Sequence, residues 1–241
     1  MNAMFESIIS NQSNQQQFDI QVLSRPESHE NQSSASEGNI NGPWVVILDN
    51  FLNSTEAETL VQLGADVGYE RSTDVAGFGD DGSSTDVVSR SRTSTNAWCN
   101  EERCTQDPVV KAIQERMEQL TGIPTSNSES LQLLRYEPGQ YYRTHHDYIG
   151  YETKRRQGVR IMTIFLYLND VKEGGETYFP QLGLSVQPKQ GRALVWPSVY
   201  DENPHAKDPR TEHRANAVVA GIKYGANAWL HQRQYDPECN W

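Results

Sequence analysis

The stretch VRIMTIFLYLND (residues 159–170) decides the fold of this 241-residue chain. Its segment IMTIFLYL is apolar on both faces of an extended strand, which is typical of a central strand covered on each side. Further short segments rich in β-branched and aromatic residues surround it, separated by Gly, Pro, Asn or Asp. They are SLQLLRYE, YYRTHHDY, ETYF, LSVQP, RALVWP, HRANAVV and KYGANAWLHQ. Strands of this length and spacing predict a mainly β fold on a double-stranded β-helix (jelly-roll) core.

Two helices are predicted to flank this core. The segment PWVVILDNFL (43–52) reads as a buried strand, and NSTEAETLVQLGADVG (53–68) follows it as a helix. Asn53, Ser54 or Thr55 can cap this helix, and Thr55 with Glu58 fits a capping box. A second helix is DPVVKAIQERMEQLTG (107–122), with an apolar stripe and a C-terminal glycine. The stripe consists of Val109, Ile113, Met117 and Leu120, and Gly122 is the expected end. Between the helices, residues 71–95 are rich in Gly, Ser and Asp and predict a long flexible loop that could act as a lid.

The first 42 residues differ in composition from the rest. Twenty of them are Asn, Gln or Ser, and hydrophobic periodicity is absent. Such a segment buries too little apolar surface to offset its ordering entropy, so we expect disorder over residues 1–42. Residues 43–241 are then left as one folded domain.

The net charge of −11 and the pI of about 5.0 exclude one class of partner. An acidic chain repels phosphate backbones, so nucleic acid is not an expected partner. No apolar stretch approaches the roughly 20 residues needed to span a bilayer, and the N-terminal segment lacks the basic and apolar regions of a signal peptide. The oligomeric state does not follow from the sequence.

Three residues in the strand-rich region have the chemistry of a metal site. His145 and Asp147 occupy alternate positions in YYRTHHDY, so they point to the same face of a strand while His146 points away. His213 opens a later strand, which a jelly roll can return to the same place. Two His and one carboxylate with open positions form the facial triad of non-haem Fe(II) oxygenases. Lys223, one strand further on, is where a dicarboxylate co-substrate could be anchored.

These segments resemble the 2-oxoglutarate- and Fe(II)-dependent dioxygenases, and within them the prolyl 4-hydroxylases of the collagen and plant cell-wall type. The resemblance covers residues 44 to 232 in order. It is carried by SRTSTNAW (91–98), LLRYEPGQYYRTHHDY (133–148), VRIMTIFLYLNDVKEGGETYFP (159–180), PKQGRALVW (188–196) and EHRANAVVAGIKYGANAWLH (212–231).

The resemblance implies hydroxylation of peptidyl proline to 4-hydroxyproline, with release of succinate and CO2. It implies Fe(II), 2-oxoglutarate and O2, with ascorbate as reductant, and a proline-containing peptide or protein as partner. The implied iron ligands are His145, Asp147 and His213, and the implied 2-oxoglutarate contacts are Lys223, Tyr136 and Thr177.

The same resemblance assigns residues to the peptide groove. They are Tyr142, Arg160, Trp229 and His231, with Glu129 as a further candidate. An aromatic wall suits the apolar proline ring, although Tyr142 and Trp229 could instead serve only in core packing.

Three alternatives stay open at this point. A 2-oxoglutarate oxygenase could act on another protein residue or another class of target, with the same metal site. A Zn-dependent hydrolase could use the same three ligands, and a jelly roll could serve as a non-catalytic binding module. Lys223 with its companions argues against the hydrolase, and an intact triad argues against the binding module.

Cys99 and Cys104 lie close in WCNEERC and could close a small disulfide loop, or they could remain free thiols. A disulfide indicates an oxidising compartment. The resemblance implies the endoplasmic reticulum lumen, although no signal peptide is visible.

Overall fold

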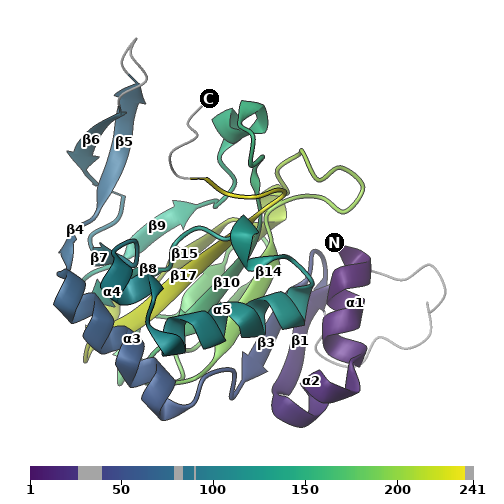
Figure 1. The fold of residues 1–241 in the computed structure, drawn as a ribbon, viewed down its shortest axis with the longest axis horizontal. Coiled ribbons are helices and arrows are strands. Elements are labelled where there is room, and N and C mark those ends of the chain that lie inside the picture. Colours follow the sequence, from purple (N-terminus) through teal and green to yellow (C-terminus); the bar gives the residue numbers. More distant parts are fainter. Residues whose placement is uncertain (27–39, 79–83, 90, 237–241) are drawn as a thin grey trace.

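Two sheets packed face to face form the core of the molecule (Figure 1). The computed structural model describes residues 1–26, 40–78, 84–89 and 91–236. Within them a nine-stranded major sheet has the order β2-β1-β3-β14-β10-β17-β8-β7-β4, and a four-stranded minor sheet has the order β13-β12-β15-β9. This is the expected jelly-roll core.

The bounds of the strands are as follows. The major sheet contains β1 (Asp19–Arg25), β2 (Ile40–Asn41), β3 (Val45–Asp49), β4 (Glu70–Arg71), β7 (Thr95–Trp98), β8 (Gln132–Tyr136), β10 (Arg160–Tyr167), β14 (Ala193–Pro197) and β17 (Lys223–His231). The minor sheet contains β9 (Tyr142–His145), β12 (Thr177–Phe179), β13 (Leu184–Val186) and β15 (His213–Ala215). Two smaller pairs join β5 (Thr73–Phe78) with β6 (Ser84–Val88) and β11 (Glu173–Gly174) with β16 (Val218–Ala220).

Strand β10 is the central strand, as its two apolar faces predict. It pairs antiparallel with β14 on one side and β17 on the other. Ile164 and Leu166 belong to the apolar cluster under the helices, whereas Phe165 and Tyr167 belong to the cluster between the two sheets. Because alternate residues point to opposite faces, one strand supplies both cores.

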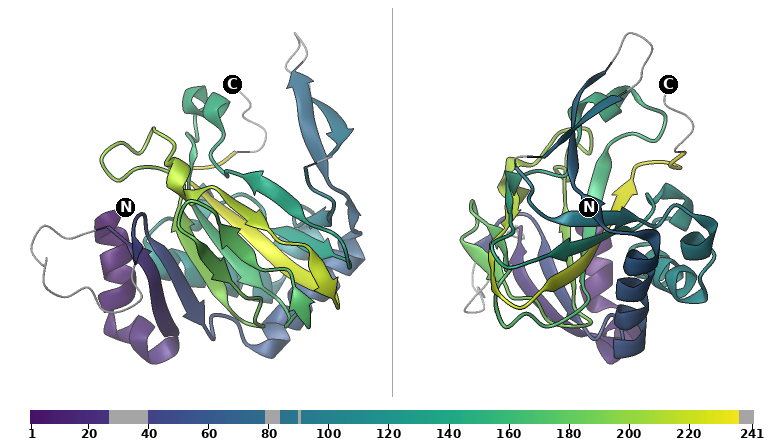
Figure 2. Two further views of the ribbon diagram at one scale, coloured as in Figure 1. Left: turned by 180° about the vertical axis from the view of Figure 1, so that it is seen from behind. Right: turned by 90° about the vertical axis from the view of Figure 1, so that its left-hand side faces the viewer.

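Helices cover the outer face of the major sheet (Figure 2). They are α1 (Asn2–Ser10), α2 (Gln12–Gln17), α3 (Ser54–Val67), α4 (Glu102–Thr105) and α5 (Pro108–Thr121), with short 3-10 turns η1 (Thr125–Asn127), η2 (Gly150–Lys154) and η3 (Pro209–Thr211). None of the helices in the described part of the chain is long and apolar enough to cross a membrane.

The ends of α3 and α5 refine the predicted caps. The capping box of α3 uses Asn53 and Glu56, each two residues earlier than the predicted Thr55 and Glu58. Helix α5 ends at Gly122 as predicted, in the left-handed conformation that glycine adopts without strain. Its buried face contains Val110, Ile113, Met117 and Leu120, while Val109 only packs partly against the core.

The prediction of disorder over residues 1–42 is wrong for residues 1–26. Strand β1 pairs antiparallel with β3 and so extends the major sheet. Helix α1 buries Phe5 and Ile8 completely, and the Phe5 ring stacks on Trp44 at 5.4 Å between centroids. A few large apolar side chains thus anchor a segment whose average composition is polar. Residues 27–39 lie outside the described residues.

The prediction of a flexible loop over residues 71–95 is also wrong for most of its length. Strands β5 and β6 pair antiparallel as a hairpin that projects from the body beside β9 (Figure 1). The tip and position 90 lie outside the described residues. The β-branched residues on both sides of the Gly-rich tip fit a hairpin better than a loop.

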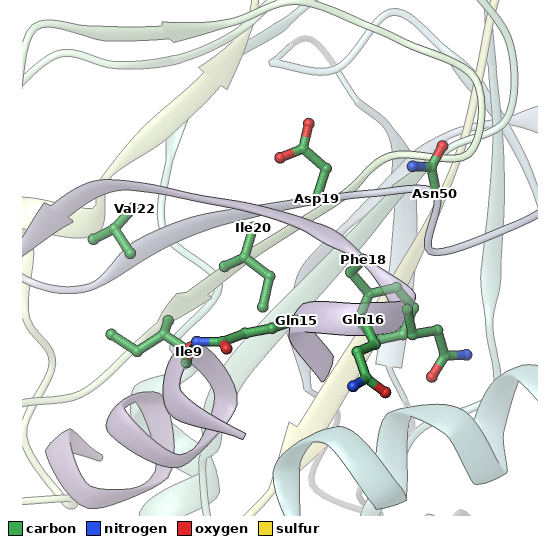
Figure 3. Close-up of a pocket in the computed structure, with 9 residues that line it drawn as sticks. Ile9, Gln15, Gln16, Phe18, Asp19, Ile20, Val22 and Asn50 are labelled. Atoms are coloured by element: carbon green, nitrogen blue, oxygen red, sulfur yellow. Dashed lines mark hydrogen bonds between the residues drawn. The ribbon is translucent and has the colours of Figure 1, made fainter. Parts of the chain in front are cut away.

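The N-terminal helices and β1 enclose a shallow groove (Figure 3). Ile9, Ile20 and Val22 line it together with the glutamines that end α2.

A disulfide joins Cys99 and Cys104, one of the two possibilities for this pair. Both cysteines are buried, and their Cα atoms lie 5.2 Å apart.

Candidate metal centre and its surroundings

His145, Asp147 and His213 converge at one end of the minor sheet. Strands β9 and β15 pair with His213 directly opposite His145, and Asp147 follows just beyond the end of β9. The potential ligand atoms of the three side chains all lie within 4.8 Å of one another. The Nε2 atoms of His145 and His213 lie 3.8 Å and 3.6 Å from the carboxylate oxygens of Asp147.

Backbone carbonyls fix the orientation of both imidazole rings. The Nδ1 of His145 donates to the carbonyl of Arg143 at 2.8 Å, and the Nδ1 of His213 donates to the carbonyl of Thr211 at 3.0 Å. A carbonyl only accepts, so the proton of each neutral ring lies on Nδ1 and the lone pair of Nε2 faces Asp147. Metal-ligating histidines usually donate their other ring N–H in this way, and this donor set fits a divalent metal with open positions.

Asp147 is held as an anion in a buried position. The Thr163 hydroxyl donates to its Oδ2 at 2.6 Å from the central strand β10. Burial by itself raises the pKa of Asp147, but His213, His145 and this hydrogen bond outweigh it and lower the pKa to about 2. The carboxylate is therefore ionised and oriented before any metal binds.

Aromatic rings enclose the two histidines. Tyr142 stacks on His145 with centroids 3.5 Å apart, and Trp196 and Phe179 contact the ring of His213. Burial, followed by the influence of His213, lowers the pKa of His145 to about 3. The ring is therefore neutral near pH 7, which is the form that binds a metal.

His146 points away from the site, as predicted, and has a structural role of its own. Its Nδ1 accepts the N–H of Tyr148, so its Nε2 carries the proton and donates to the carbonyl of Asp208 at 2.8 Å. This ring thereby links the end of β9 to the turn η3 that leads into His213. The sequence analysis did not predict this link.

Lys223 lies in a narrow pocket next to the triad. Strands β17 and β8 pair with Lys223 opposite Tyr136. The ammonium is almost fully buried, donates to the Gly175 carbonyl at 2.7 Å and lies 5.1–5.4 Å from the ring centroids of Tyr136, Phe165 and Tyr167. Burial lowers its pKa to about 7, against a smaller opposing influence of Glu176.

The same pocket holds the other predicted co-substrate residues. It is lined by Leu134, Tyr136, Tyr142, His145, Phe165, Thr177, Trp196, His213, Ala215, Lys223 and Asn227. Tyr167, which the sequence analysis missed, donates to the Thr177 hydroxyl at 2.7 Å. That bond leaves the proton of Thr177 free to be donated. One narrow pocket thus joins a cation and a hydroxyl donor to the open side of the metal centre.

Four of the five residues assigned to the peptide groove form a buried network, whereas Tyr142 stacks on His145. Arg160 pairs with Glu129 through two guanidinium nitrogens and lies over the ring of Trp229, with 3.7 Å between its Cζ and the ring centroid. His231 bonds Glu129 at 2.8 Å on one nitrogen and the carbonyl of Gly158 at 2.9 Å on the other. Because Arg160 and Thr163 share β10, the network adjoins the metal centre.

The structure also places near the site residues to which no role was assigned from the sequence. They are Thr163, Tyr167, Trp196, Arg92 and Glu152. Their contacts come from strands and turns distant in sequence. Only Thr163 and Tyr167 could have been indicated by the sequence, because they are four residues apart on β10 and therefore point to the same face of the strand.

Comparison with known proteins relates this arrangement to one superfamily. A family model described as the 2OG-Fe(II) oxygenase superfamily matches residues 131–231. The chain is 36% identical over 234 residues to probable prolyl 4-hydroxylase 10 of Arabidopsis thaliana, a match that covers 85% of this chain and 77% of that protein. It is 37% identical over 147 residues to prolyl 4-hydroxylase subunit alpha-1 of Rattus norvegicus, covering 59% of this chain and 27% of that subunit.

A solved structure agrees with these similarities. The viral collagen prolyl hydroxylase of Paramecium bursaria Chlorella virus-1, solved as a 2-oxoglutarate complex, superposes with a TM-score of 0.62 at 26% identity. The superposition covers 79% of this chain and 97% of the viral chain.

Proposed function

This chain belongs to the prolyl 4-hydroxylases of the 2-oxoglutarate- and Fe(II)-dependent oxygenase superfamily, and from that premise we propose that His145, Asp147 and His213 bind its iron. The reaction is the hydroxylation of peptidyl proline to 4-hydroxyproline. The two Nε2 lone pairs and the Asp147 carboxylate would hold the iron, a donor set typical of non-haem Fe(II) oxygenases.

Lys223, Tyr136 and Thr177 bind 2-oxoglutarate in this proposal. The distal carboxylate accepts a charge-assisted hydrogen bond from the Lys223 ammonium and a second one from the Thr177 hydroxyl. Tyr167 leaves the Thr177 proton free for that purpose. The pocket connects with His145 and His213, so a dicarboxylate seated there extends its other end toward the metal.

The protein positions the reactants and excludes water. With Fe(II), 2-oxoglutarate and O2 bound, oxidative decarboxylation of the co-substrate to succinate and CO2 drives hydroxylation of the proline ring. The rings of Tyr142, Trp196 and Phe179 surround the histidines and exclude water from the reacting centre. No acid or base is required of the chain.

The peptide lies along Tyr142, Arg160, Trp229 and His231 in this proposal. Glu129 acts through Arg160 and His231, because it bonds both of them and is itself buried. Ascorbate serves as reductant. The Cys99–Cys104 disulfide supports an oxidising compartment, and with the family relationship it favours the endoplasmic reticulum lumen.

The observation that carries the proposal is the convergence of the triad beside the buried ammonium of Lys223. Its test is succinate release from 2-oxoglutarate with Fe(II) and ascorbate, with and without a panel of proline-containing peptides. The wild type gives peptide-stimulated turnover and a product 16 Da heavier on proline. His145→Ala abolishes both, whereas His205→Ala, on an exposed loop, retains them. Peptide-independent turnover alone would contradict proline as the substrate.

A further inference from the structure

Glu152 is a buried carboxylate next to the site that the mechanism does not use. It lies in η2, five residues after Asp147, and only 4% of its surface is exposed. In Figure 1 this turn stands above the sheets. Its surroundings include Arg160, Glu129 and His231, whose charges all act on it.

Within the described residues, the Oε2 of Glu152 is fully buried and has no hydrogen-bond partner. Burial raises its pKa, against smaller opposing influences of Arg160 and His231. Leaving a buried polar group without a partner is unfavourable, and more so for a charged group. A group kept at such a cost calls for a ligand or another explanation.

The neighbouring cations already have partners. Arg160 directs two guanidinium nitrogens to Glu129, and both ring nitrogens of His231 face other acceptors. The guanidinium of Arg155 lies over the ring of Tyr151, 4.9 Å from its centroid. Among the described contacts none of these cations donates to the buried Oε2 of Glu152, although Glu129 leaves the Nη1 group of Arg160 unused.

A second buried group near Arg160 also has no partner. The indole N–H of Trp229 has no acceptor, and the ring of Trp229 lies against the Arg160 guanidinium. One side of this network therefore offers an unused acceptor and another offers an unused donor. An extended peptide carries both complementary groups on its main chain.

The charge of Arg160 decides which donor suits Glu152. A lysine or arginine side chain entering beside that guanidinium would be repelled and would lose its hydration. A neutral main-chain N–H is not repelled, and removing it from water costs less than removing a charged group. Proline has no N–H of its own, so the donor must come from a neighbouring residue of the substrate.

We propose that Glu152 is a peptide-recognition residue whose carboxylate accepts a main-chain N–H of the bound substrate, from a residue adjacent to the hydroxylated proline. This inference rests on the proposed prolyl hydroxylase function and adds a recognition element to it. It also requires the turn η2 to admit the peptide between Glu152 and the Arg160 network.

The test compares the wild type with Glu152→Gln and Glu152→Leu, using an alanine-based peptide with a single proline. Its ester analogues replace one flanking amide N–H at a time by oxygen. Glu152→Leu raises the KM for the amide peptide about tenfold or more, since a hydrogen bond to a charged group is lost. Glu152→Gln, which keeps an acceptor, has a smaller effect. The matched control is Glu115→Leu, an exposed position on α5.

Two further readings separate recognition from a structural role. For the wild type, one ester analogue should have the same raised KM that the amide peptide has for Glu152→Leu. For Glu152→Leu, the KM values of that ester and of the amide peptide should be equal. In addition, Glu152→Leu unfolds at a higher temperature than the wild type, because a buried carboxylate without a partner has been removed.

The opposite results would overturn the proposal. A lower unfolding temperature with an unchanged KM would assign Glu152 a structural role. Equal discrimination against esters by wild type and Glu152→Leu would exclude an N–H contact. A wild type that consumes 2-oxoglutarate but hydroxylates no proline peptide would refute the proposed function itself. The unfolding temperatures of the variants can be measured whatever the outcome of that activity assay.

Discussion

Single hydrogen bonds fix the geometry of the metal centre before any ion arrives. The Nδ1 protons of His145 and His213 are donated to carbonyls two residues earlier, and Thr163 orients the Asp147 carboxylate. Because each ligand is already directed inward, little reorganisation is needed on binding. The strength of binding should therefore depend on residues that never touch the metal.

Thr163→Val tests this dependence. The substitution keeps the shape of the side chain and removes its hydrogen bond to Asp147, so we expect Fe(II) affinity to fall about 10- to 100-fold. The matched control is Thr121→Val, at another buried threonine whose hydroxyl donates to the Met117 carbonyl far from the site. Titration with Fe(II) under anaerobic conditions measures both. Equal affinities for the two variants would show that Thr163 does not orient the ligand.

Lys223 makes co-substrate binding depend on pH. Burial lowers its pKa to about 7 in the unliganded pocket, whereas a bound dicarboxylate requires the ammonium form. Above pH 7 the lysine is mostly neutral and must take up a proton when 2-oxoglutarate binds, so the KM for 2-oxoglutarate rises with pH. The slope approaches about tenfold per pH unit above pH 8. Lys223→Gln has a high KM at every pH and lacks the slope. A flat profile in the wild type would contradict the lowered pKa.

The triad and Lys223 were predictable from the sequence because their residue types and order are distinctive. It assigned Glu129 and Arg160 to the peptide groove but did not show that they pair with each other, since 31 residues separate them. Tyr167 was read only as part of an apolar strand. Its hydroxyl contact to Thr177 depends on how two strands pack, which residue pattern alone does not determine.

Among the larger elements, the start of α3 shows how local rules can select the wrong residue. Asn53 and Glu56 satisfy each other's backbone N–H groups, and Glu56 also pairs with Arg116 of α5. The sequence offered several polar residues that could cap this helix. The ion pair to a distant helix favours Glu56, and only the tertiary structure contains that information.

We expect Asn53→Ala to lower the free energy of unfolding by about 1 kcal/mol, because the N-terminal cap is lost. Thr55→Ala is the matched control, since the capping box predicted from sequence would have used Thr55. Urea unfolding at pH 7 measures both variants. A larger loss in Thr55→Ala than in Asn53→Ala would restore the sequence-based assignment of the cap.

Most strands from β8 to β17 were predictable because turn residues bound them, but β11 was not predicted and the single segment HRANAVV forms the two strands β15 and β16. The hairpin β5–β6 was not, since its Gly- and Asp-rich centre dominated the interpretation of residues 71–95. Composition averaged over a long window conceals two short strands that pair with each other. The same averaging misled the prediction of disorder for the N-terminal segment.

At the scale of the whole molecule, residues 1–26 are part of the domain. Strand β1 covers the edge of β3 that would otherwise be open, and α1 packs on the cluster that includes Trp44 and the helix α5. An uncovered strand edge is a site for aggregation. The N-terminal segment therefore both completes the major sheet and enlarges its apolar core.

Phe5→Ala decides between a docked and a disordered N-terminal segment. Phe5 is completely buried and stacks on Trp44, so its truncation should cost about 3–5 kcal/mol of unfolding free energy. Glu6→Ala, at the adjacent exposed position of the same helix, is the control and should change stability by less than about 0.5 kcal/mol. Urea unfolding followed by tryptophan fluorescence reports both values, because Trp44 lies at the contact. If residues 1–26 were disordered, the two variants would unfold at the same midpoint as the wild type.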